Sequence, residues 1–501
     1  MNKEKLFNRL LEIFPGALTW LVLTSPLWLS LRFPFFVAGL ILFLNVYWFY
    51  KAIRIAIFSV VGYRKMQKAI STDWGARLES LGKNWEDFHH LLVIPTLKEP
   101  LEVLDSTLGA ITKSCYPKDK IMVLLAFEEK EGKEKLKIKK ENLETKYKDK
   151  FKKLFVTIHP KDFPGHHPGP GSNRTYAVQE ILPKLDKMGI DFEKVILTTL
   201  DADFAIHPRF LAGLIYKYLT TNSPEHKAFT GVFWYYNNFW QAPVLNRIVA
   251  SGVSFWQLSE MTGSNKYMNF SSHSINLKSL IEMDFWVVDK VNDDGEFFWR
   301  AYFHFGGDYK VIPHFLPIYA DTVQHENLWE SLKEQYLQLR RWAYGVEHMP
   351  YIVKTWWRRR DIPFFPKTDR LLFLIQGYLT WATLAVLITF GGAVLQLINP
   401  QFAKTVIGYN LPRFSSFILT LAFIGLFTLI VVHEKVAPKR PRDWGLGPRI
   451  LSYLQWFLVP ITILSFATFP ALDAQTRLMF GKYMEFRVTR KFRTAKVPFV
   501  Q

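Results

Sequence analysis

Five long stretches of this chain contain no charged residue, and they constrain its fold more than any other feature. Each is close to, or above, the roughly twenty residues that a helix needs to cross the hydrocarbon core of a bilayer. A core helix can be equally apolar, but five such runs gathered at the two chain ends favour membrane-spanning helices. The runs are Phe14–Leu31, Phe33–Tyr50, Leu371–Ala403, Phe414–Val432 and Ile450–Leu472.

The first two runs are predicted to form a helical hairpin, because they are short and contain Pro26 and Pro34. The N-terminus lacks a small-residue cleavage site after a brief apolar region, which argues against a removed signal peptide. The last run contains Pro460 and Pro470. It is therefore the weakest candidate for a full crossing, and a re-entrant or interfacial segment is the alternative.

The net charge of +19 comes from 63 Lys and Arg against 44 Asp and Glu. No nucleic-acid-binding module accompanies this charge, so a membrane surface is the favoured partner and nucleic acid is not expected. Cys115 is the only cysteine, which excludes an internal disulfide and fits a reducing compartment. The basic excess lies in Lys133–Lys153, which is predicted to be a solvated helix face, and in Trp356–Arg360, Lys435–Arg449 and Arg477–Lys496.

The middle of the chain, from about Arg54 to Arg370, has the composition of a soluble α/β domain. Short, nearly continuous apolar runs alternate there with helix-like stretches such as Pro100–Ser114 and Ser172–Leu185. This alternation predicts a parallel sheet covered by helices on both faces. The expected strands are His90–Thr96, Lys120–Phe127, Lys194–Leu200 and the weaker Leu154–His159.

Acidic residues follow three of these strands, and ligands of such sheets bind beyond the carboxyl ends of the strands. Glu99 follows the first strand and Glu128 the second, whereas Asp201 and Asp203 follow the third. A lone acid at a strand end is usually a turn residue, but acids at three neighbouring ends favour a polar ligand or cation. A turn can aim Asp201 and Asp203 at one hard cation, with diphosphate oxygens completing its shell.

Three further segments carry candidate site residues. Gly and Pro before Ser172 predict a loop, and Ser172 is the expected N-cap of a helix whose N–H groups can contact phosphate. Asp293 and Asp294 resemble the first turn of another helix. Gln338, Arg341 and Trp342 are spaced i, i+3 and i+4, which places hydroxyl-, phosphate- and sugar-binding side chains on one helix face.

Together these motifs resemble those of membrane-embedded family-2 glycosyltransferases, the group that includes cellulose, chitin and hyaluronan synthases. The resemblance covers about Leu91–Trp342 and implies an α/β, glycosyltransferase A-type (Rossmann-like) cytoplasmic domain inserted between transmembrane helices. Asp201-Ala202-Asp203 matches the DxD motif, Asn292-Asp293-Asp294 stands in place of Thr-Glu-Asp, and Gln338, Arg341 and Trp342 match QxxRW. Departures are Glu128, where the family usually has a nucleobase-contacting aspartate, and a missing lysine in the segment before Asn173.

The resemblance assigns roles to these positions. Asp294 would be the general base, and Asp203 with Asp201 would hold Mg²⁺ or Mn²⁺, Asp201 also counting among the catalytic residues. Gln338, Trp342 and Asp293 would bind the acceptor or product. The expected nucleotide-sugar contacts are Thr96, Glu99, Glu128, Ser172, Asn173 and Arg341.

Near the C-terminus, Phe486-Arg487-Val488-Thr489-Arg490-Lys491 resembles the FxVTxK gating loop of cellulose synthases. Its residues Phe486, Val488, Thr489 and Lys491 would cover the nucleotide pocket. A cytoplasmic tail requires an even number of crossings after the catalytic domain, so we expect Ile450–Leu472 to lie at the interface.

The resemblance thus implies an inverting, metal-dependent transferase in the plasma (inner) membrane, with a UDP-sugar as the expected donor. A growing polysaccharide is the first acceptor; a lipid carrier or glycolipid receiving one sugar is the alternative, and a non-catalytic membrane scaffold is the third. Membrane lipids are expected partners. The expected domains are a hairpin (1–62), the catalytic domain (63–345), an interfacial segment (346–370), transmembrane helices (371–476) and a basic tail (477–501).

Overall fold

The structure is a computed structural model that describes residues 3–82, 84–167 and 169–487. Its internal contacts divide the chain into two compact units, each assembled from separate segments. Unit 1 comprises Met1–Val61, Pro243–Glu260 and Asn327–Met484, and unit 2 comprises Gly62–Ala242, Met261–Glu326 and Glu485–Gln501.

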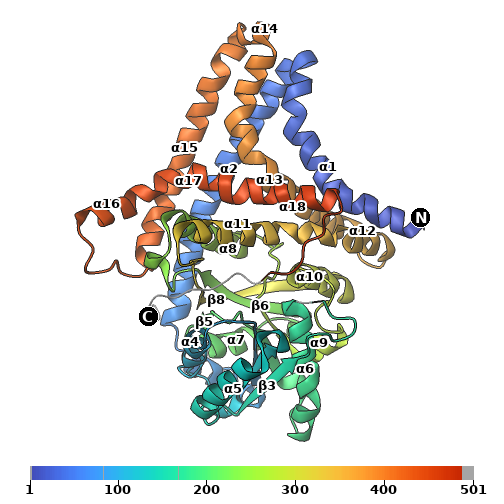
Figure 1. Cartoon of the computed structure of the whole chain (residues 1–501), viewed down its shortest axis with the longest axis vertical. Helices are drawn as coiled ribbons and strands as arrows, with labels where there is room; N and C mark the ends of the chain where they lie inside the picture. Colours follow the sequence, from blue (N-terminus) through green and yellow to red (C-terminus); the bar gives the residue numbers. More distant parts are fainter. Residues whose placement is uncertain (1–2, 83, 168, 488–501) are drawn as a thin grey trace. The chain divides into compact units, whose positions relative to one another are not determined.

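Unit 2 is built on one eight-stranded sheet with the order β3-β2-β1-β4-β7-β6-β8-β5 (Figure 1). Strands β3, β2, β1 and β4 are parallel, β7 is antiparallel to both β4 and β6, and β8 is parallel to β6 and antiparallel to β5. The strands are β1 (His89–Thr96), β2 (Ile121–Glu128), β3 (Lys153–His159), β4 (Val195–Thr199), β5 (Ala205–Ile206), β6 (Lys227–Trp234), β7 (Ser274–Asn276) and β8 (Lys310–Tyr319).

The four predicted strands are confirmed as β1 to β4. Every residue of β2 and β4 is buried, as expected for strands whose side chains are covered on both faces of a sheet. Helices join these strands, so the expected alternation is also confirmed. The helices of unit 2 are α3 (Trp74–Glu79), α4 (Leu101–Ile111), α5 (Lys133–Tyr147), α6 (Pro170–Lys187), α7 (Phe210–Leu219), α9 (Leu277–Glu282) and α10 (Asp293–His304).

Unit 1 is almost entirely helical. The described part of the chain has five helical segments that are long and apolar enough to cross a membrane, which is consistent with a membrane protein. The helices are α1 (Lys3–Arg32), α2 (Pro34–Ser71), α8 (Val244–Gly263), α11 (Leu328–Ala343), α12 (Met349–Arg358), α13 (Phe364–Ile398), α14 (Pro400–Ala403), α15 (Val406–Val436), α16 (Leu446–Leu454), α17 (Val459–Thr462) and α18 (Phe469–Met479).

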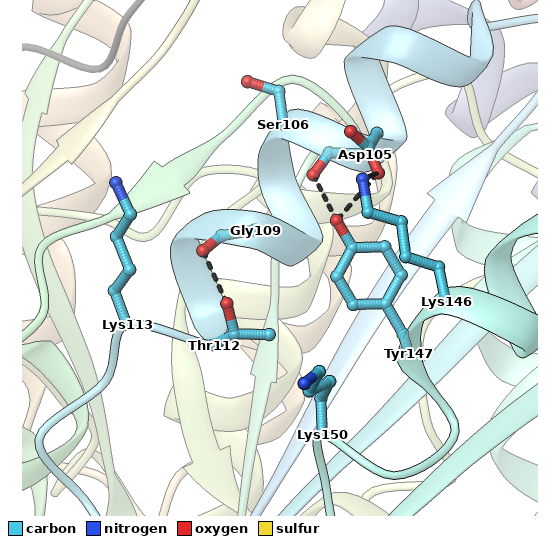
Figure 2. A pocket seen from close by; sticks show the side chains of 8 residues that line it. All are labelled: Asp105, Ser106, Gly109, Thr112, Lys113, Lys146, Tyr147 and Lys150. Atoms are coloured by element: carbon cyan, nitrogen blue, oxygen red, sulfur yellow. Dashed lines mark hydrogen bonds and ion pairs between the residues drawn. The ribbon is translucent and has the colours of Figure 1, made fainter.

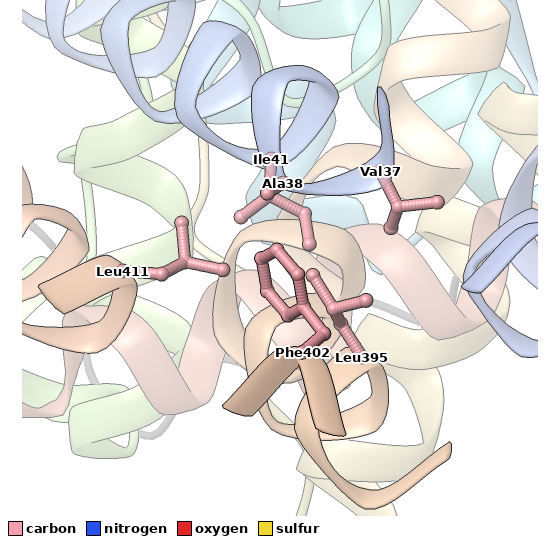
Figure 3. Close-up of a cluster of buried hydrophobic side chains, with 6 residues drawn as sticks. All are labelled: Val37, Ala38, Ile41, Leu395, Phe402 and Leu411. Carbon is pink, nitrogen blue, oxygen red and sulfur yellow. The ribbon is translucent and has the colours of Figure 1, made fainter. Parts of the chain in front are cut away.

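Four of these segments, α1, α2, α13 and α15, run side by side within unit 1 (Figure 1). A cluster of fully buried side chains joins α2 to α13, α14 and α15, with the Phe402 ring at its centre (Figure 3). The outer faces of the same helices expose large apolar side chains, including Phe43, Phe417 and Phe427. A buried seam combined with an exposed apolar surface is the arrangement that a lipid environment stabilises.

The fifth segment, Leu446–Met479, differs from the other four. It is interrupted by a 3₁₀ turn at Gln455–Leu458 and a π-helical stretch at Ile463–Thr468, and it runs across the four helices in Figure 1. Its last helix, α18, packs closely on α1, because a Cβ on Gly16 would lie 2.8 Å from the carbonyl oxygen of Gln475. The segment is nevertheless among the five that are long and apolar enough to cross a membrane, so its interfacial placement stays a prediction.

Candidate functional site

The carboxyl ends of β1, β2 and β4 lie at one edge of the sheet, because these three strands are adjacent and parallel. The acids that follow them are therefore gathered at that edge. Thr96 ends β1, Glu128 ends β2, and Asp201 and Asp203 lie in the turn after β4.

Glu99 is held within its own loop. Its Oε2 accepts hydrogen bonds from Thr96 Oγ1 at 2.8 Å and from the Leu97 backbone N–H at 2.5 Å. The turn requires a left-handed backbone at Lys98, where φ is 67°. Burial raises the pKa of Glu99 even though these bonds oppose the rise.

Glu128 is a second buried acid of this edge whose pKa is raised. Its side chain is buried, and it lies opposite His159 in the β2–β3 pairing. Burial raises the pKa of Glu128 to about 7, and the nearby Lys130 limits the rise. A carboxyl with a pKa near neutrality at the carboxyl end of a parallel strand is a candidate ligand-binding position.

The two acids of the DxD motif have different environments. Asp201 is partly exposed, and its Oδ2 accepts a hydrogen bond from Ser271 Oγ at 2.8 Å. Asp203 is buried, and its Oδ2 accepts the backbone N–H of Asp321 at 3.0 Å. Asn237 braces this second contact, because its amide donates to the Asp203 carbonyl at 3.2 Å and to Asp321 Oδ1 at 3.0 Å.

A divalent cation fits the chemistry of this turn, since carboxylate oxygens are the ligands that Mg²⁺ and Mn²⁺ prefer. Within residues 3–82, 84–167 and 169–487, no group of three or more His, Cys, Asp or Glu side chains is arranged to hold a metal. Asp201 and Asp203 would therefore need ligand oxygens from elsewhere, as a bound diphosphate would supply.

The expected N-cap at Ser172 is wrong. Helix α6 begins two residues earlier, at Pro170, with Gly169 as its N-cap. Proline suits the first position of a helix because its missing N–H has no intrahelical partner there. The Ser172 hydroxyl instead donates to backbone carbonyls, including that of Gly169 at 3.1 Å.

Asn173 and its neighbour Arg174 anchor the start of α6 in the sheet. The Asn173 amide donates to the Ala126 carbonyl in β2 at 2.7 Å, and both side chains are about 1% exposed. Arg174 was not predicted from the sequence. The spacing of the apolar residues did point to it, because Arg174 precedes Val178, Ile181 and Leu185 by four, seven and eleven residues. It therefore shares the buried face of α6 with them.

The expected helix start at Asp293 and Asp294 is confirmed as the first turn of α10. Asp293 is buried and forms an ion pair with Arg174. Asp294 is half-buried, and its Oδ1 accepts the N–H of Gly295 at 2.9 Å. The N-terminal end of a helix stabilises the charged form of such carboxylates.

Gln338, Arg341 and Trp342 lie on α11, a helix as expected, in unit 1. The amide of Gln335 donates to Gln338 Oε1 at 3.3 Å. Arg340, which directly precedes Arg341, forms an ion pair of 2.9 Å with Asp473 and so holds α11 against α18. The roles of the QxxRW side chains remain predictions.

Of the gating-loop residues, Phe486 is described, whereas Val488, Thr489 and Lys491 lie outside the described residues. The Phe486 ring packs against the start of α6, with its Cγ 3.7 Å from the position of a Cβ on Gly169. The tail segment therefore approaches the same helix start that carries Asn173 and Arg174.

A cavity of about 410 Å³ lies elsewhere, between α4 and α5 (Figure 2). Its lining includes Lys113, Lys146 and Lys150, and Tyr147 donates a 2.8 Å hydrogen bond to Asp105 within it. The cavity lining contains no predicted site residue.

Comparison with known proteins gives structural matches alone: no family model matches the chain, and no curated protein matches its sequence. A mannosyltransferase from Pyrobaculum calidifontis, PcManGT, solved with GDP-Man and Mn²⁺, is 12% identical with a TM-score of 0.40, over 86% of this chain and all of that one. Residues 1–349 of S. aureus TarS, solved with UDP-GlcNAc, are 13% identical with a TM-score of 0.32, over 70% of this chain and 93% of that one. Both TM-scores lie below 0.5, so these matches assign no function to this chain.

Proposed function

We propose that this protein is an inverting, metal-dependent glycosyltransferase that moves a sugar from a nucleotide-diphospho-sugar to a growing polysaccharide at the membrane. One observation supports the proposal: a series of contacts, partly to fully buried, joins the acids after β4 to the acids at the start of α10. Asp201 contacts Ser271, the Ser271 carbonyl accepts from Arg174 at 3.1 Å, and Arg174 pairs with Asp293, the neighbour of Asp294. Transfer of a sugar needs both a leaving-group site and a base, and the two acid pairs supply them.

The donor would bind across the strand ends, with its diphosphate at the DxD turn and its base near Glu128. Asp294 would take the proton from an acceptor hydroxyl as that oxygen attacks the anomeric carbon. The bond between this carbon and the diphosphate oxygen breaks, and the nucleoside diphosphate leaves from the opposite face. A cation held by Asp203 and Asp201 would neutralise charge on the diphosphate.

The remaining assignments belong to the same proposal. Arg341 would bind the diphosphate, and Gln338 and Trp342 would bind the acceptor. Phe486 and the rest of its loop would cover the bound nucleotide. Thr96, Glu99, Ser172 and Asn173 lie near the donor edge. The α/β unit would face the cytoplasm and the apolar helices would span the plasma membrane.

Release of nucleoside diphosphate by detergent-purified protein tests the proposal. UDP- and GDP-sugars are supplied with Mg²⁺ or Mn²⁺, beside Asp203→Ala and Asp294→Asn variants. Release from one donor, lost in both variants, would support the transferase. Failure of the wild type to bind any nucleotide with Mn²⁺ would favour the scaffold instead.

Product size then identifies the acceptor. A ladder of products resistant to lipid extraction would support polymer synthesis. A single product that partitions into organic solvent would support transfer to a lipid carrier, which the small number of apolar helices keeps as the second candidate.

A further inference from the structure

Arg174 is a fully buried cation at the centre of the proposed site. It occupies the apolar face of α6, and about 1% of its surface is exposed. Burying an arginine is costly unless its charge is paired and its N–H groups are bonded. A buried arginine that meets these requirements links the segments that carry its partners.

The guanidinium of Arg174 meets both requirements. It forms an ion pair with Asp293, and its Nη1 donates to Thr199 Oγ1 at 3.0 Å and to the Ser271 carbonyl at 3.1 Å. Its Nε donates to the Pro170 carbonyl at 3.2 Å, and the guanidinium lies 4.9 Å from the ring centroid of Trp286. These partners belong to four separate stretches of unit 2.

The contacts of Arg174 join the two halves of the proposed site. Thr199 is the last residue of β4, two residues before Asp201, and Ser271 donates to the Asp201 carboxylate. On the other side, Asp293 directly precedes Asp294 in the first turn of α10. Arg174 therefore lies between the donor turn and the base.

Close backbone packing reinforces this connection. A Cβ on Gly171, one turn before Arg174, would lie 2.5 Å from the Val287 carbonyl oxygen and 2.8 Å from the Asp293 Cβ. Only glycine allows the first turns of α6 and α10 to approach this closely. The distance between them is thus fixed by packing as well as by charge.

We propose that Arg174 is a positioning residue that holds the Asp294 carboxylate in place relative to the DxD turn. This inference rests on the proposed function, in which Asp294 is the general base. A misplacement of about 1 Å at a reacting group can cost about 10²-fold in rate. Loss of Arg174 is therefore expected to lower kcat without weakening donor binding.

The alternative is that Arg174 only balances the buried charge of Asp293, and a pair of variants separates the two roles. Arg174→Met leaves Asp293 buried without its cation and is expected to lower the melting temperature. Arg174→Met combined with Asp293→Asn removes both charges and should restore much of that loss. The carbonyl of Ser271 and the hydroxyl of Thr199 still lose their donor in the double variant.

The expected result for the double variant is a kcat about 10²-fold below that of Asp293→Asn alone, a comparison that accounts for any acceptor contact of Asp293. The Kd for nucleotide and Mn²⁺ should stay within about threefold of wild type. Arg174→Lys keeps the positive charge but loses the forked guanidinium donors. Its melting temperature should therefore stay near that of wild type while its kcat falls. Recovery of wild-type kcat together with stability in the double variant would overturn the proposal. Arg209→Met is the control, because Arg209 is another arginine of unit 2 that donates to a backbone carbonyl, that of Ile70, although it is only partly buried.

Hydrogen exchange supplies a readout that needs no turnover. In the double variant the amides of residues 293–297 should exchange faster while those of β1 and β2 stay protected; unchanged protection of 293–297 would also overturn the proposal. Asp294→Asn is measured in parallel. Normal turnover in that variant would refute the assignment of Asp294 as the base, and the exchange result would then show only that Arg174 orders the first turn of α10.

Discussion

Both units bury polar side chains, but they hold them in different ways. In unit 2, one arginine connects a strand end, a loop and two helices through several bonds. In unit 1, the contacts between helices are spread over separate side chains: Thr19 bonds Gln475 at 2.7 Å and Trp20 bonds Thr476 at 2.9 Å between α1 and α18, and Asn45 bonds Ser415 at 3.0 Å. Substitutions at the Arg174 connection of unit 2 should therefore change turnover, whereas those at the Thr19 and Asn45 contacts of unit 1 should change stability slightly and turnover little.

The largest expected effect is that of Asp294→Asn. Loss of a general base typically costs about 10²–10⁴-fold in turnover, and the amide should leave the fold and donor binding intact. Initial rates of nucleoside diphosphate release, with a nucleotide titration, measure both. Asn292→Gln is the control and should be mild; near-wild-type rates in Asp294→Asn would show that another group is the base.

Gly171→Ala should come next. The added methyl would collide with the Val287 carbonyl oxygen at 2.5 Å, and backbone cannot rotate away as a side chain can. We expect α10 to shift and kcat to fall about 10²-fold, with a lower melting temperature.

Gly109→Ala provides the comparison for Gly171→Ala. Its Cβ would meet only the Tyr147 hydroxyl at 3.7 Å, an ordinary contact, and alanine favours a helix interior. Equal losses in the two variants would contradict the special role of the α6–α10 approach.

Glu128→Gln should alter how stability depends on pH. Burial raises the pKa of Glu128 from 4.5 to about 7, so folding disfavours its charged form. The stability associated with the protonated acid is complete below about pH 4.5 and is lost as pH rises towards 7. The free energy of unfolding of the variant, relative to wild type, should therefore rise by about 3 kcal/mol as pH goes from 4.5 to 8.

Unfolding of the ligand-free protein at several pH values measures this difference. Glu129→Gln, one residue further on and partly exposed, is the control and should follow the wild-type curve. Parallel curves for Glu128→Gln and wild type would show that the carboxyl is not desolvated in solution.

The smallest effect should be that of Thr19→Val in unit 1. It removes the hydroxyl that bonds Gln475, and such contacts between apolar helices are worth about 0.6 kcal/mol on average. Thr24→Val is the control, since Thr24 bonds the Trp20 carbonyl of its own helix. Unfolding in bicelles compares the two; a loss of turnover in Thr19→Val would contradict the separation of roles between the units.

Much of the fold could be predicted from the sequence, because the strongest patterns are local. Charge-free runs became the long helices, and continuous apolar runs became β1 to β4. Strand β8 could not be predicted, since Pro313 and Pro317 argue against a strand in its interior. The sheet accommodates them through a register shift opposite Thr230 to Val232 and a left-handed Phe315, whose φ is 61°.

The candidate site likewise contains residues that could be predicted from the sequence and residues that could not. Asp201, Asp203 and Asp294 could be proposed as candidates from the sequence, because acids after apolar strands or at helix starts stand out there. Arg174, Asn237 and Asp321 were missed, because their importance comes from partners about 80 to 120 residues away. Only the folded chain brings those partners together.

The close approach at Gly171 also restricts how this protein can change over generations. Arg174 and Asp293 can be exchanged as a pair without loss of folding, since a second substitution can compensate the buried charge that the first leaves behind. No second side chain can compensate a methyl at Gly171, because the atom it meets is the Val287 carbonyl oxygen of the backbone. A library covering every position should therefore find the charged pair replaced in combinations among stably folded clones of low activity, but Gly171 fixed in every active clone.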